Sequence, residues 1–133
     1  VWSADQYSDG GTTIRSDKPV SQASPTLYDQ ALYQTARTGK SLNYAVPLPP
    51  GVYTVHLKFA ELWLTEPGQR PMNITVNGRL VRENWDPATA AGQLAMAADF
   101  RIDDITPDKD GRITVRLDAV GANDAIVQGM EIE

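Results

Sequence analysis

Apolar and polar residues alternate along most of the chain, and this period-two pattern predicts β-strands. The clearest example is the segment YTVHLKFAE, in which Tyr53, Val55, Leu57 and Phe59 share one face while polar residues occupy the other. We expect a strand there with one buried face and one solvated face. The same alternation predicts strands within residues 32–37, 41–48, 72–81, 98–103, 112–120 and 129–133.

Short groups of turn-forming residues separate these strands. Asn77-Gly78 is the strongest hairpin signal, because both residues can take positive φ. Residues 49–51 (PPG) and 108–111 (DKDG) have turn chemistry as well, and residues 87–93 (PATAAGQ) predict one irregular turn. About seven to nine short strands, each with one buried face, are expected to form two antiparallel sheets packed face to face, so the predicted fold class is an all-β sandwich.

The alternation breaks down in the stretch KFAELWLTEPGQRP. Continued into this stretch, the register puts Glu61 and Trp63 on the inner face and the two leucines, Leu62 and Leu64, on the outer one. Because a charge then faces the core, we predict that the chain leaves the strand near Glu61, through a bulge or a turn. Trp63 then either fills the edge of the core or stands at a loop root as a flat apolar surface on which a pyranose ring can stack.

Composition and charge narrow the classes of function. The chain has 133 residues, 41% of them hydrophobic and 22% charged, which suits one folded domain. Its net charge is −5 and no cluster of Lys and Arg is present, which argues against nucleic acid and membrane surfaces as partners. No apolar run approaches the roughly 20 residues that span a bilayer. The absence of cysteine excludes disulfides, thiolate metal sites and a cysteine nucleophile.

The residue types that usually catalyse reactions or bind metals do not occur in this sequence at the spacings such sites require. His56 is the single histidine and lies mid-strand on the polar face, with no acidic or serine partner indicated by the spacing. The DKDG turn at 108–111 lacks the distal ligands of a calcium loop, and the YSDGG stretch at 7–11 is interpreted as a turn in preference to a cation site. No pair of carboxylates is marked out as a glycosidase acid and nucleophile. We therefore predict a non-catalytic protein with no cofactor and no metal.

Five motifs follow one another along nearly the whole chain. They are ALYQTAR at 31–37, LNYAVPLPPGVYTVHLKFAELWL at 42–64, GQRPMNITVNGRLV at 68–81, WDPATAAGQLA at 85–95 and GANDAIVQGMEI at 121–132. The most specific part is PPGVYTVHLKFAE, followed by GQR and VNG. In this order the motifs resemble the malectin domain family, which is also classed as carbohydrate-binding module family 57.

The resemblance implies a jelly-roll-type β-sandwich, which agrees with the strand pattern. It also implies that loops at one end of the sandwich bind an oligosaccharide or polysaccharide. The opening WSADQYSDGG is similar to that of family modules inside large bacterial glycosidases, so residues 1–133 are expected to be a single domain excised from a larger protein. The implied partner is then a linked catalytic domain in the same chain, and the implied location is secreted, periplasmic or at the cell surface.

Five positions match binding positions of the family. Trp63 and Leu64 stand where an aromatic pair follows the Glu of the FAE motif. Asp124, in ANDA, matches an acidic residue that would accept hydrogen bonds from sugar hydroxyls, although an Asx-turn is its structural alternative. Arg37 and Thr38 match the end of a TER-aromatic motif, and Arg37 is either a sugar contact or one half of a structural ion pair.

The match is incomplete at several positions. Leu64 and Thr38 are not aromatic, and Ala36 stands where the family has Glu. A further aromatic of an early loop has Tyr28 and Tyr7 as nearby candidates. These departures put the ligand of the family's animal member in doubt for this chain.

Two functions follow from the residues and the resemblance. The first is a non-catalytic carbohydrate-binding module, in which Trp63 supplies a stacking surface while Asp124 and Arg37 supply directional hydrogen bonds. The second is a structural spacer that has kept the fold and lost the ligand. Trp85 also has two alternatives: it either offers a second stacking face for a sugar or packs under the loop that follows it.

Overall fold

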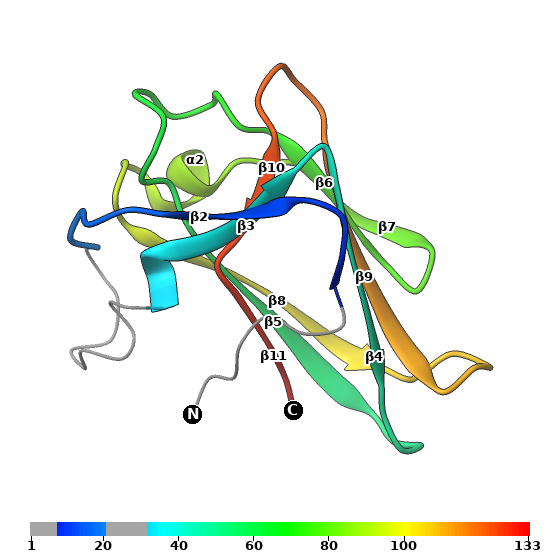
Figure 1. Ribbon diagram of the computed structural model, residues 1–133. Helices are drawn as coiled ribbons and strands as arrows, with labels where there is room; N and C mark the ends of the chain where they lie inside the picture. Colours follow the sequence, from blue (N-terminus) through cyan, green and yellow to red (C-terminus); the bar gives the residue numbers. More distant parts are fainter. Residues whose placement is uncertain (1–7, 21–31) are drawn as a thin grey trace.

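Most of the described chain, residues 8–20 and 32–133, is folded into antiparallel β-strands in this computed structural model (Figure 1). In chain order the strands are β1 (Ser8–Asp9), β2 (Thr12–Arg15), β3 (Thr35–Gly39), β4 (Ser41–Pro47), β5 (Tyr53–Ala60), β6 (Met72–Val76), β7 (Arg79–Trp85), β8 (Ala97–Ile105), β9 (Arg112–Ala119), β10 (Ala125–Val127) and β11 (Gly129–Ile132), with a short helix, α2 (Pro87–Ala91), between β7 and β8. The sequence did not predict β1, β2 and β10, which have only two, four and three residues.

The strands form two layers. One layer is a five-stranded sheet with the order β1-β4-β9-β6-β7. The other consists of two three-stranded sheets, β10-β3-β2 and β11-β5-β8. The C-terminal segment connects these two sheets, because β10 pairs with β3, β11 pairs with β5, and the Gln128 N–H between them donates to the Lys58 carbonyl at 2.9 Å. The predicted jelly-roll-type, all-β sandwich is confirmed.

The alternating segments pack as the sequence predicts. On β5, Val55, Leu57 and Phe59 are at most 1% exposed. The buried residues of β4, β6 and β9 that share this core are Leu42, Tyr44, Met72, Ile74, Val76, Ile113, Val115 and Leu117. Burial of side chains of this size contributes about 1.5–3 kcal/mol each, so this shared core is the main source of stability.

Trp85 belongs to this core. It is 7% exposed, and its ring centroid lies 5.6 Å from that of Phe59 and 5.2 Å from that of Phe100. The packing alternative predicted for Trp85 is therefore confirmed, and this indole offers no surface to a ligand.

Asn77 and Gly78 form the predicted hairpin turn between β6 and β7. Their φ angles are 50° and 78°, the positive values that a tight hairpin requires. The Asn77 amide also accepts from the Thr114 N–H at 2.9 Å and donates to the Thr106 carbonyl at 2.9 Å. The turn is therefore tied to the neighbouring chain as well as closed within itself.

Two local predictions were wrong. The strand predicted within residues 32–37 starts only at Thr35, because Leu32 and Tyr33 are helical. Tyr33 is 4% exposed, and its hydroxyl donates to Asp99 Oδ1 at 2.7 Å, so its tertiary contacts override a strand-like pattern. Residues 87–91, predicted as part of an irregular turn, form α2, which ends at Gly92 with a φ of 92°.

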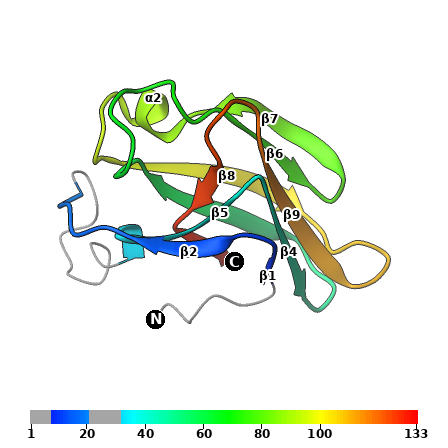
Figure 2. The same cartoon turned by 45° about the horizontal axis from the view of Figure 1, so that its top comes forward.

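The loops and turns gather at the two ends of the sandwich. Residues 61–71, here called the β5–β6 loop, lie beside α2 and near the β9–β10 loop (residues 120–124) at one end, whereas the turns that join β4 to β5 and β8 to β9 lie at the other (Figures 1 and 2). No helix within residues 8–20 and 32–133 is both long enough and apolar enough to cross a bilayer.

Candidate functional site

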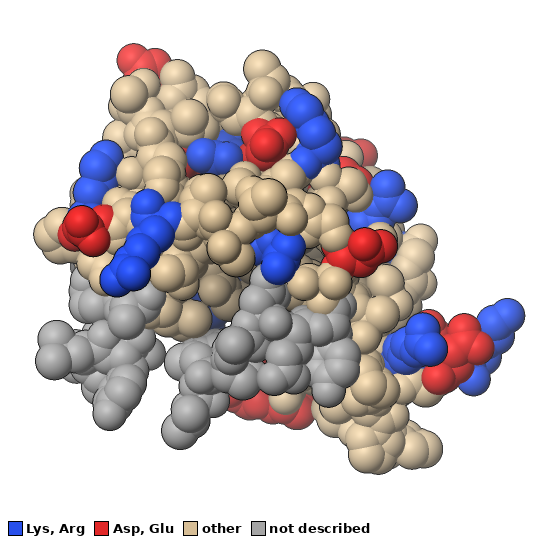
Figure 3. Space-filling model, viewed as in Figure 1, with Lys and Arg blue, Asp and Glu red and all other residues tan. Residues whose placement is uncertain are grey.

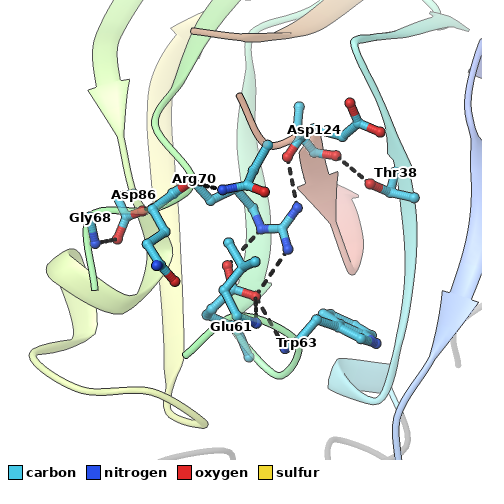
Figure 4. A network of polar contacts seen from close by, with 12 residues as sticks. Thr38, Glu61, Trp63, Gly68, Arg70, Asp86 and Asp124 are labelled. Carbon is cyan, nitrogen blue, oxygen red and sulfur yellow. Dashed lines mark hydrogen bonds and ion pairs between the residues drawn. The ribbon is translucent and has the colours of Figure 1, made fainter. Parts of the chain in front are cut away.

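Glu61 explains why β5 ends at Ala60. Its side chain is 2% exposed, and one carboxylate oxygen, Oε2, accepts from the N–H groups of Trp63 and Leu64 at 3.2 Å each (Figure 4). The backbone that would have continued the strand turns instead around this carboxylate. The predicted departure from the strand near Glu61 is confirmed, and a buried anion at the turn is its physical cause.

Arg70 is the partner of this buried anion. Its Nε lies 2.6 Å from Glu61 Oε1 and its Nη2 lies 3.2 Å from Oε2, while the arginine itself is 5% exposed. The third used donor, Nη1, reaches the main-chain carbonyl of Asp124 at 2.8 Å (Figure 4). A buried ion pair is stable only if hydrogen bonds within the protein replace those that both ions made with water. The contacts described above for Glu61 and Arg70 are hydrogen bonds of this kind.

Asp86 fixes the far side of the β5–β6 loop. Its carboxylate accepts from the Gly68 N–H at 2.9 Å, from the Arg70 N–H at 2.8 Å, and from the N–H and hydroxyl of Thr89 at 2.9 Å each. Burial acts to raise the pKa of the Asp86 carboxyl, but these four hydrogen bonds outweigh it and leave the pKa below its ordinary value of 3.8. The same ionised carboxylate therefore caps α2 and holds the loop against it.

Two amide side chains complete the network. Gln69 Oε1 accepts from the N–H groups of Thr65 and Glu66 at 3.1 Å each, which folds the tip of the β5–β6 loop onto itself. Asn123 Nδ2 donates to the Gln69 carbonyl at 2.6 Å and thereby joins the β9–β10 loop to the β5–β6 loop a second time. The loops at this end are held by side chains in place of strand pairing.

Trp63 lies at the edge of this network. It is half-buried, and it packs against both hydrophobic clusters of the protein. Its indole N–H donates to the Arg15 carbonyl at 3.2 Å. Leu62 is 2% exposed within the smaller cluster, whereas Leu64 is half-buried. Trp63 thus packs at the edge of the core and remains partly accessible to solvent.

Asp124 keeps its carboxylate accessible. The side chain is 42% exposed, and Oδ1 lies 3.6 Å from the Nζ of Lys40, which is itself 72% exposed. Next to it, the Thr38 hydroxyl donates to the Ala125 carbonyl at 3.0 Å. On the face shown in Figure 3, basic and acidic groups are interspersed and no patch of one sign forms.

Arg37 has a different orientation from its neighbour Thr38. Successive residues of a strand point to opposite faces, and the Arg37 Nη1 donates to the carbonyls of Gly10 and Gly11 at 2.8 and 3.1 Å. Its guanidinium thus holds the turn between β1 and β2. The network described above connects Trp63, Leu64 and Asp124, and Thr38 bonds to the next residue, Ala125, whereas the hydrogen bonds described for Arg37 are with the turn between β1 and β2.

Comparison with models of protein families shows which family this chain belongs to. The model of the malectin domain matches residues 1–132. The chain belongs to the malectin domain family. The predicted resemblance is therefore confirmed over nearly the full length of the sequence.

Several proteins that contain a similar domain are longer than this chain. Malectin-B of Xenopus laevis is 37% identical over 70 residues, which are 51% of this chain and 25% of that protein. The crystal structure of a β-glucuronidase from Bacteroides uniformis matches with a TM-score of 0.73 at 22% identity, covering 94% of this chain and 14% of that one. The ANXUR1 extracellular domain from Arabidopsis thaliana matches with a TM-score of 0.73 at 20% identity, covering 95% and 39%. The chain thus spans a minor part of each.

Sequence reasoning missed three residues that build this end of the malectin domain, namely Arg70, Asp86 and Asn123. A signal for the first was available, because an acidic residue on the inner face of a strand end requires a cation, and Arg70 follows Glu61 by nine residues. Tyr7 and Tyr28, the candidates for a further aromatic contact, lie outside the described residues. Within residues 8–20 and 32–133, no group of three or more His, Asp or Glu side chains is placed to hold a metal ion.

Proposed function

We propose that this malectin domain binds carbohydrate, without transforming it, at the end of the sandwich formed by the β5–β6 and β9–β10 loops. One observation carries the proposal: the main-chain N–H of Trp63, whose side chain is half-buried, and the main-chain carbonyl of Asp124, whose carboxylate is exposed, are hydrogen-bonded to the same buried Glu61–Arg70 pair. A flat apolar ring and a directional acceptor are the two elements that a pyranose requires, because it has one face of C–H bonds and an edge of hydroxyls.

Each group has a defined part in binding. The accessible face of Trp63 stacks on the sugar ring, and Leu64 extends this apolar surface. The Asp124 carboxylate accepts from sugar hydroxyls, for which the exposed Lys40 ammonium at 3.6 Å is a weak competitor. The Thr38 hydroxyl is a further polar group on that side. Each hydroxyl that exchanges water for protein gains only about 0.5–1.5 kcal/mol, so the affinity for one or two sugar units is modest.

A modest affinity is sufficient for a targeting role. A binding module in the same polypeptide as an enzyme raises the local concentration of substrate through effective concentration, without contributing catalysis. The fold similarity to part of a β-glucuronidase chain and to an extracellular receptor domain supports a role as one domain of a larger protein outside the cytoplasm.

A second function, a spacer that has lost its ligand, has one observation in its favour. The Trp63 indole N–H already donates to the Arg15 carbonyl, so this donor is not left for a sugar hydroxyl. In this case the end of the sandwich contacts a neighbouring domain in place of a sugar.

Isothermal titration calorimetry with a panel of α- and β-linked oligosaccharides separates the two functions. The binding proposal predicts saturable binding of at least one glycan and a loss of affinity of at least tenfold in Asp124→Ala. Val52→Ala is the matched control, because Val52 is 67% exposed in the β4–β5 turn at the opposite end. Absence of binding across the panel favours the spacer, and turnover of a chromogenic glycoside by the purified domain would contradict a non-catalytic role.

A further inference from the structure

Arg70 contacts both halves of the candidate site at once. Through Nε and Nη2 it holds the Glu61 carboxylate, whose Oε2 also accepts from the N–H groups of Trp63 and Leu64. Through Nη1 it holds the main-chain carbonyl of Asp124, which is 54 residues away in the sequence. The stacking residue and the acceptor residue are thus connected by a single guanidinium (Figure 4).

We propose that Arg70 is a positioning residue for carbohydrate binding, which fixes the Trp63 indole relative to the Asp124 carboxylate. This inference rests on the function proposed above. Arg70 touches the sugar at no point in this account and acts through the backbone of the two loops. Its contribution is to order both loops before a ligand arrives, which removes an ordering cost from the binding step.

Arginine is suited to this task for a geometric reason. Its planar fork presents donors in fixed directions, so it can bind a carboxylate with two N–H groups and a carbonyl with a third. A lysine ammonium is a compact point charge on a flexible stem and does not reproduce this arrangement. Arg70→Lys therefore keeps the charge beside Glu61 but loses the simultaneous link to Asp124.

Burial makes the arrangement stiff. Arg70 is 5% exposed and Glu61 is 2% exposed, so water does not compete for their hydrogen bonds. The surrounding backbone is held on both sides of one peptide group, because the Arg70 N–H donates to the Asp86 carboxylate and the Gln69 carbonyl accepts from Asn123 Nδ2. The loops consequently have one preferred relative placement.

A purely structural role predicts a different outcome, and the double variant Glu61→Leu/Arg70→Met distinguishes the two. Replacing both buried charges by apolar side chains of similar size is commonly tolerated by a fold, whereas removal of one charge is not. The double variant has no acceptor for the Trp63 and Leu64 N–H groups and no donor for the Asp124 carbonyl. We expect it to fold and to bind the glycan at least tenfold more weakly than the wild type.

Amide hydrogen exchange supplies a readout that does not depend on any ligand. In the double variant, exchange at Trp63 and Leu64 should be at least tenfold faster, while exchange in the core of β9 stays unchanged. Arg101→Gln/Asp103→Asn is the matched control, because this ion pair has side chains 62% and 55% exposed on the outer surface of β8. It should alter neither exchange at the loops nor glycan affinity.

Each outcome decides the inference. Wild-type affinity in a folded double variant overturns the positioning role and leaves the proposed function standing. If the wild type binds no glycan of the panel, the proposed function fails, and exchange at Trp63 and Leu64 in Arg70→Lys, which keeps Glu61 as their acceptor, decides whether Arg70 orders the loops. If the double variant does not fold, Arg70→Lys takes its place, with at least threefold weaker binding or threefold faster loop exchange expected, and no change in either overturning the inference.

Discussion

The two ends of the sandwich are built by different means. At the far end, the turns close with neighbours in the sequence: Asp108 Oδ1 accepts from the N–H groups of Asp110 and Arg112 at 2.9 and 3.1 Å, and the Tyr53 hydroxyl donates to the Pro49 carbonyl at 2.8 Å. At the candidate-site end, the buried Arg70 and Asp86 also join loops to segments that lie far away in the chain. The far end therefore depends more on local turn chemistry, even though Asn77 bonds to Thr106 and Thr114, and the site end depends more on the completed fold.

Arg70→Ala tests this difference with the largest expected effect. It leaves the Glu61 carboxylate buried without its partner, which should lower the free energy of unfolding by about 3–5 kcal/mol. Urea denaturation followed by far-UV circular dichroism measures the change. A loss below about 1 kcal/mol, typical of an exposed ion pair, would contradict a buried and coupled role for this residue.

Asp86→Asn tests the second buried anion at the same end. An amide cannot accept at both positions, so at least one buried N–H group loses its partner, and we expect a loss of about 1–3 kcal/mol at pH 7. Because the folded-state pKa of Asp86 is lowered, its ionised form stabilises the protein above the ordinary value of 3.8, and this contribution is lost as the pH falls through the folded-state pKa.

The pH dependence gives Asp86→Asn its control. The difference in unfolding free energy between wild type and variant should shrink as the pH falls below 3.8, since both proteins then carry a neutral side chain at this position. Denaturation curves at neutral and acidic pH measure it. A difference that is constant with pH would show that the charge of Asp86 does not contribute.

Gly111→Ala tests the far end with a smaller expected effect. Gly111 has a φ of 76° and open space around the position of a Cβ atom, so the substitution introduces backbone strain without a clash. We expect a loss of about 1 kcal/mol in the free energy of unfolding, with glycan affinity unchanged. Thermal unfolding and a binding titration measure the two quantities, and weaker binding in this variant would remove the proposed independence of the two ends.

The sequence predicted the regions where a residue's neighbours determine its conformation. Val55, Leu57 and Phe59 are buried on one face as their spacing requires, and Asn77-Gly78 forms its turn with the positive φ angles that its residue types favour. Leu32 was wrongly placed in a strand, since local pattern cannot detect a helical start that tertiary contacts stabilise. The sandwich as a whole was predictable for the same reason, because the alternation of apolar and polar residues reports directly which face of each strand is buried.

The site was less predictable for a related reason. The misfit of Glu61 with the inner face was visible in the sequence, and it located the break in the strand. The choice of Arg70 as its partner, and the link from Arg70 to Asp124, require the fold to bring together residues that the chain separates by nine and 54 positions. Trp63 is intermediate, because its sequence context was consistent with both the buried and the accessible parts that the structure assigns to its ring.

The central claim is that the accessible face of Trp63 is the stacking surface of a carbohydrate site. The most direct test is calorimetric titration of the wild type, Trp63→Ala and Val52→Ala with the best-binding glycan of the panel, after circular dichroism has established that all three are folded. If Trp63 is the stacking surface, the wild type and Val52→Ala bind saturably, and Trp63→Ala loses at least tenfold in affinity. Equal affinity in all three proteins would contradict it.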